Sequence, residues 1–128
     1  MSKVSKTLLS DTGTNLEVTG NKVQADGFRN LTDGLHTVGF YLNDFVGRLI
    51  IQGTLVLDPQ EEDWVSLTLE GESNAYIQFD AISPGEGLIV RNFTGNFVFV
   101  RAVVTRSHIS PEPDPSTVGS VSKALLNN

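Results

Sequence analysis

The sequence predicts an all-β protein, an antiparallel β-sandwich or jelly roll with extended N- and C-terminal arms. Apolar and polar side chains alternate at the two-residue period of a strand, and turn residues separate the alternating segments. No window of about a dozen residues shows an apolar stripe at helical period without a Gly or Pro inside it. Several short strands, about eight here, are typical of sandwiches and jelly rolls.

Residues 1–33 are interpreted as an N-terminal arm that feeds short strands into a sheet. Turn signals such as Asp11-Thr12-Gly13 and Gly20-Asn21 divide this segment. Between the turns, only residues 4–9 and 16–18 have the composition of a strand.

Residues 34–108 are predicted to form the core of the sandwich. The strand candidates, in order, are residues 37–42, 48–57, 64–69, 76–79, 88–93 and 97–104. The side chains expected to supply much of the core are Phe40, Leu42, Ile50, Val65, Leu67, Phe79, Ile89, Phe97, Phe99 and Val103.

Residues 109–128 are interpreted as a Pro-rich C-terminal arm. Proline cannot donate a ladder hydrogen bond, so the run from Pro111 to Pro115 is expected to pass outside the sandwich as a stiff spacer. The short apolar segment that follows is then free to reach a neighbouring subunit. The predicted partner-binding residues are Val118, Val121, Leu125 and Leu126.

Charge and composition narrow the classes of partner. Nine Lys and Arg residues stand against fifteen Asp and Glu residues, a net charge of -6, which argues against nucleic acid or anionic lipid. No apolar run approaches the roughly 20 residues that cross a bilayer, and the N-terminus lacks the apolar core of a signal peptide. There is no cysteine, which fits assembly in a reducing cytoplasm.

The sequence contains no recognisable catalytic, cofactor-binding or metal-binding motif. We therefore expect no enzyme activity and no cofactor. His36 and His108 stand alone in the sequence and are read as surface histidines. The acidic group Asp58, Glu61, Glu62 and Asp63 is read as a solubilising loop, with a calcium site or a glycosidase-like carboxylate pair as less favoured alternatives.

Two further features concern single side chains. Arg101 lies inside an apolar strand and should be paired or lie at an interface, with Asp80 or Glu70 as the proposed partner. Trp64 is expected to pack in the core or at its rim. Alternatively, Trp64 forms a platform for a sugar together with Tyr41 and Tyr76.

Four segments carry a resemblance to a known group of proteins. These are GFYL at 39–42, FVGRLIIQGTL at 45–55, DWVSL at 63–67 and FTGNFVFVRA at 93–102. Their order resembles the small β-sandwich virion structural proteins of tailed bacteriophages, especially the myovirus type that infects marine cyanobacteria.

The resemblance implies a non-enzymatic virion protein, most simply a capsid decoration or cement subunit, assembled in the host cytoplasm. Its partners would be other virion proteins of the capsid, neck or tail and copies of itself, without nucleic acid or membrane. A discoidin-like carbohydrate-binding jelly roll has a similar order of strand and turn segments. The alternative function is therefore a β-sandwich module that recognises a host surface glycan.

Overall fold

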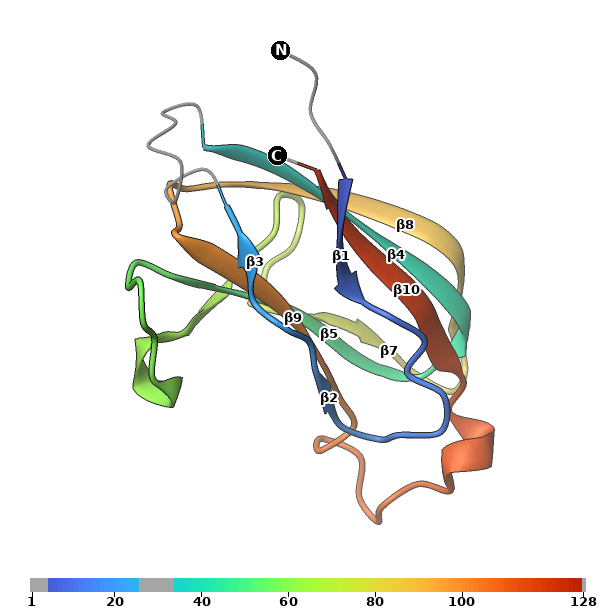
Figure 1. Cartoon of the computed structure of the whole chain (residues 1–128). Coiled ribbons are helices and arrows are strands. Elements are labelled where there is room, and N and C mark those ends of the chain that lie inside the picture. Colours follow the sequence, from blue (N-terminus) through green and yellow to red (C-terminus); the bar gives the residue numbers. More distant parts are fainter. Residues whose placement is uncertain (1–4, 26–33, 128) are drawn as a thin grey trace.

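The structure, a computed structural model that describes residues 5–25 and 34–127, is an antiparallel β-sandwich, as predicted (Figure 1). Sheet A has the order β1 (Ser5–Leu9), β10 (Ser120–Asn127), β4 (Leu35–Phe45) and β8 (Gly85–Thr94). Sheet B has β9 (Phe99–Thr105) and β5 (Gly47–Thr54) at its centre. The short strands β2 (Val18–Thr19) and β3 (Val23–Gln24) pair with β9, and β6 (Val65–Leu67) and β7 (Ile77–Phe79) pair with β5.

The chain passes repeatedly between the two sheets, so strands that are distant in sequence become neighbours. Within the described residues there is no α-helix, and the helical elements are the single 3-10 turns η2 (Glu61–Asp63) and η3 (Pro115–Thr117). Neither turn, nor any other described helical segment, has the length and apolar character needed to span a membrane.

The core lies between the sheets and follows the alternation of each strand. In sheet B the core-facing side chains of the two central strands are Leu49 and Ile51 of β5 and Val100, Ala102 and Val104 of β9. Sheet A contributes a second set that is equally inaccessible to solvent: Val38, Phe40, Leu42, Phe93, Val121, Ala124 and Leu126. Each large side chain buried here contributes about 1.5–3 kcal/mol of hydrophobic stabilisation.

The predicted core is correct in part. Phe40 and Leu42 are buried in it, and Leu67, Phe79, Ile89 and Phe97 pack against it while remaining partly accessible. The prediction is wrong for Ile50 and Val103, which pair with each other on the outer face of sheet B, and for Val65, which is exposed. Phe99 is buried, but it alternates with Val100 and so also lies on that outer face. Both faces of β9 carry large apolar side chains, so alternation alone could not tell which one meets sheet A. In β5 the polar residues Arg48 and Gln52 share a face with Ile50 and mark that face as the outer one.

The predicted C-terminal arm is wrong, because residues 120–127 form β10 inside sheet A. This strand lies between β1 and β4 and pairs with both. Val118, Val121 and Leu126 are therefore buried in the chain's own core, and only Leu125 of the predicted partner-binding residues points to the outer face. A β-bulge between Val121 and Lys123 breaks the two-residue period, which hid the strand in the sequence.

The predicted N-terminal arm is also part of the domain where the structure describes it. β1 forms an edge of sheet A, whereas β2 and β3 form an edge of sheet B. The boundaries predicted at residues 33/34 and 108/109 therefore do not separate arms from a core, because both ends supply strands. Residues 1–4, 26–33 and 128 of these predicted segments lie outside the described residues.

A buried arginine joins the connections between the sheets. Arg106 follows β9 and is only 3% exposed. Its guanidinium donates hydrogen bonds to five backbone carbonyls and lies 4.6 Å from the centre of the Phe45 ring. Burial lowers the pKa of Arg106, and the nearby carboxylate of Glu17 opposes this change. The five acceptors are the carbonyls of Asn15, Leu16, Val46, Val118 and Gly119.

We predict that Leu126→Ala lowers the free energy of unfolding by about 2–5 kcal/mol, because it leaves a cavity in the core. Leu125→Ala, on the neighbouring outward position of β10, should cost less than about 1 kcal/mol. Urea denaturation of the two variants measures this difference. Equal effects at the two positions would show that β10 does not pack in the core as described.

We also predict that Arg106→Met lowers the free energy of unfolding by more than about 3 kcal/mol, since it removes five hydrogen bonds at once and leaves the buried Val46 carbonyl without this donor. The matched control is Arg48→Met, at a partly exposed arginine that stacks on Tyr76, with an expected cost within about 1 kcal/mol. Denaturation at neutral pH is the measurement. A loss at Arg106 no larger than the loss at Arg48 would contradict the role assigned to the buried guanidinium.

Candidate functional site

The connection between β5 and β6, residues 55–64, exposes an unusual amount of apolar surface. Leu55 is 72% exposed, Leu57 is 69% exposed, and Val65 at the start of β6 is 54% exposed. Val56 is also exposed. In Figure 1 this connection is drawn in green and projects from one end of the sandwich. We call residues 55–65 the apolar loop; exposed apolar clusters of this kind are typical of contact sites.

Arg101 of β9 holds the apolar loop against the outer face of sheet B. Its guanidinium donates two hydrogen bonds to the carboxylate of Glu61, at 3.3 and 3.1 Å. Its Nε donates to Gln52 of β5 at 2.8 Å, and its guanidinium carbon lies 4.3 Å from the centre of the Trp64 ring. The predicted partners Asp80 and Glu70 are therefore wrong. The partner comes from the acidic group that the sequence analysis read as a solubilising loop.

The backbone of the loop is fixed at both of its ends. Before the loop, buried Thr54 accepts a hydrogen bond from the Val98 amide at its carbonyl and one from the Val56 amide at its hydroxyl. Toward the other end of the loop, the Gln60 amide donates to the Asp63 carboxylate at 2.7 Å, which closes the start of η2. The apolar side chains are thus presented by a loop that is already ordered.

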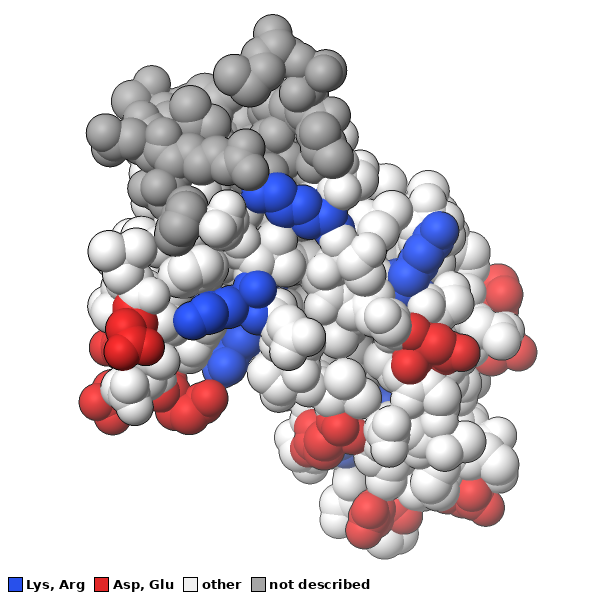
Figure 2. Space-filling view, viewed as in Figure 1, with Lys and Arg blue, Asp and Glu red and all other residues white. Residues whose placement is uncertain are grey.

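The electrostatics of the loop are dominated by acidic side chains. Figure 2 shows acidic groups gathered over the projecting loop, beside basic side chains on the adjoining part of the same face. Hydrogen bonding to Arg101, and then its positive charge, lower the pKa of Glu61 from its ordinary value. The Glu61 side chain is 87% exposed and that of Arg101 only 12%, so the pair sits at the rim of the protein.

Cations cover each aromatic ring that was proposed for a sugar platform. Arg101 lies over Trp64, the Arg48 guanidinium carbon is 3.9 Å from the centre of the Tyr76 ring, and the Lys123 ammonium is 4.6 Å from that of Tyr41. The Tyr41 ring belongs to sheet A, whereas Trp64 and Tyr76 adjoin sheet B. The three rings therefore do not form one platform.

The two histidines do not share a site. His36, predicted at the surface, is fully buried: its ring stacks on Phe93 with centroids 4.7 Å apart, and its Nδ1 donates to the Gly34 carbonyl at 2.9 Å. His108 is partly buried, and burial followed by the charge of Arg48 lowers its pKa while Asp80 raises it. Among the described residues, no three His, Cys, Asp or Glu side chains group in a way that could hold a metal ion.

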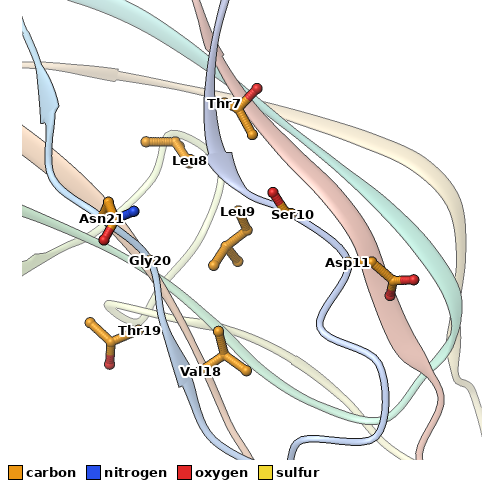
Figure 3. A pocket seen from close by; sticks show the side chains of 9 residues that line it. All are labelled: Thr7, Leu8, Leu9, Ser10, Asp11, Val18, Thr19, Gly20 and Asn21. Carbon is orange, nitrogen blue, oxygen red and sulfur yellow. The ribbon is translucent and has the colours of Figure 1, made fainter.

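A small pocket of about 250 Å³ lies between β1 and β2. Figure 3 shows the side chains of Leu9 and Val18 in the space between these two segments. Gly20 lines it where a Cβ atom would collide with the Leu8 carbonyl, so glycine is required by the close approach of two chain segments. The volume is below the roughly 300–1,000 Å³ of typical ligand sites, so we assign the pocket no ligand.

Comparison with known proteins adds no relative. No protein-family model, no curated protein and no solved structure matches this chain.

Acid should release the loop from Arg101, and Trp64 reports on it as the single tryptophan of the sequence. Because the Glu61 pKa is lowered in the folded protein, the ion pair persists above the ordinary carboxyl range and is lost as the pH falls through the folded pKa. We predict a step in Trp64 fluorescence with a midpoint below 4.5, the ordinary value for this group. Glu61→Gln should remove the step, and Glu62→Gln should leave it in place. A step that survives in Glu61→Gln would show that another group causes it.

Proposed function

We propose that this chain is a non-enzymatic structural protein of a tailed-phage virion, a decoration or cement subunit that binds other virion proteins through the apolar loop. The observation that supports this proposal is the combination of exposed Leu55, Leu57 and Val65 with a backbone already held by Arg101 and Thr54. The assignment to a virion rests on the resemblance of the strand sequences.

The energetics suit a contact that is repeated many times. Each large apolar side chain that becomes fully buried in a partner contributes about 1.5–3 kcal/mol. A loop that is ordered before binding loses little conformational entropy in the complex, so more of this gain remains as affinity. A modest affinity per copy becomes strong attachment when many copies engage one lattice.

The strand order supports the jelly-roll form of the sandwich. We count β2 with β3 and β6 with β7 as single interrupted strands, because each pair lies along the same edge of one central strand. The eight resulting strands then run 1-8-3-6 in sheet A and 2-7-4-5 in sheet B. We propose that this wrapping is a jelly roll, a fold of eight strands in two Greek keys.

Binding through the loop predicts that the double variant Leu55→Asp, Leu57→Asp co-sediments at least tenfold more weakly with particles assembled without the protein. Both positions are exposed, so the free energy of unfolding should change by less than about 0.5 kcal/mol. The matched control is Ile82→Asp, at a side chain that is 99% exposed in another loop. Undiminished binding by the double variant would exclude the apolar loop as the attachment site.

A further inference from the structure

We propose that two copies of this chain pair face to face through the outer surface of sheet A. Leu88 and Val90 of β8 are about half exposed on that surface, at 52% and 49%. The register places Val90 beside Gly39 of β4, and Gly39 beside Leu125 of β10. The centre of the face is thus an apolar strip that crosses three strands.

The charge of this face favours a second copy. Residues that pair across neighbouring strands form three outward-facing rows, which start at Leu88, Val90 and Asn92 of β8. Lys123 is the one charged side chain in these three rows. A molecule with a net charge of -6 repels its copies wherever carboxylates face each other. These rows contain no carboxylate, so two copies can approach here with little repulsion.

The edge of sheet A is closed to an added strand at the same place. The Val90 carbonyl accepts a hydrogen bond from the Arg91 guanidinium at 2.8 Å, and the Asn92 carbonyl accepts one from the Glu70 amide at 2.8 Å. The Arg91 side chain is itself held by Glu72 at 3.1 Å. Capped carbonyls protect an edge strand against pairing with another chain. These two hydrogen bonds favour a contact through the face of the strand over one through its edge.

A two-fold axis parallel to β4 gives a self-complementary arrangement. This axis lays β10 of one copy over β8 of the other, so Leu125 meets Val90 of the second copy. It also sets Lys123 beside the start of β8 in the second copy, where Glu86 lies two residues before Leu88. Gly39 lies near the axis, and its missing side chain allows the sheets to approach the roughly 10 Å spacing of packed sheets.

The size of the face predicts weak pairing. The axis over β4 overlaps three strands of each copy, and three strands about 4.8 Å apart and about seven residues long at ~3.3 Å per residue cover roughly 330 Å² in each copy. Stable interfaces use about 800 Å² per partner. We therefore expect a weak dimer, with a Kd in the micromolar range.

Sedimentation equilibrium of the purified full chain, from about 1 to 200 μM, tests the proposal across this affinity range. The weight-average mass should rise with concentration from 13.9 kDa toward twice that value. Val90→Asp should remain monomeric throughout. Val56→Asp, the same change in the apolar loop, should pair like the unmodified chain, which separates this interface from the loop. Thermal melting confirms that each variant is folded.

A charge exchange tests the symmetry of the pair. Lys123→Glu and Glu86→Lys should each weaken pairing at least tenfold, and the double variant should recover most of the loss. Three results would overturn the proposal: a monomeric unmodified chain at every concentration, dimers of a folded Val90→Asp variant, or a double variant no better than the single ones.

Discussion

The arrangement of the two sheets depends on the buried guanidinium of Arg106. Three of the connections that cross between the sheets, β1–β2, β4–β5 and β9–β10, come together around Arg106, and irregular backbone at such crossings has carbonyls without a ladder partner. Arg106 donates to carbonyls from all three connections. One side chain therefore gives a donor to carbonyls of all three connections, including the buried carbonyl of Val46. It also fixes where β10 enters the middle of sheet A.

The outer faces of the two sheets differ in how far cationic side chains cover their apolar surface. On sheet B, cations lie over aromatic rings in three pairs: Lys22 over Phe99, Arg101 over Trp64, and Arg48 over Tyr76. Such pairs shield apolar surface and keep a charged group toward water. Sheet A has one pair of this kind among the described residues, Lys123 over Tyr41, and Leu88 and Val90 remain half exposed. This difference leaves the apolar loop and the face of sheet A as the two candidate contact surfaces.

The candidate site was visible in the sequence only as separate parts. Leu55 and Leu57 were read as the end of a strand, but the strand ends at Thr54, and the residues beyond it are exposed. Arg101 was correctly expected to have a partner. The choice of Glu61 depends on a loop 40 residues away folding back over β9, and no local pattern encodes that approach. Nothing in the sequence distinguishes Arg106, because a single arginine beside a turn has the same local pattern as an exposed basic residue.

The sequence by itself determined the fold class and the approximate positions of most strands, because alternation and turn residues act within a few neighbouring residues. Only the tertiary structure decided which face of β9 is inward, since both of its faces carry large apolar side chains and the choice depends on what sheet A presents. It also decided that residues 120–127 form a strand of the core. A bulge had removed their local signature, and their place is set by pairing with β1 and β4 and by the hydrogen bonds of Arg106.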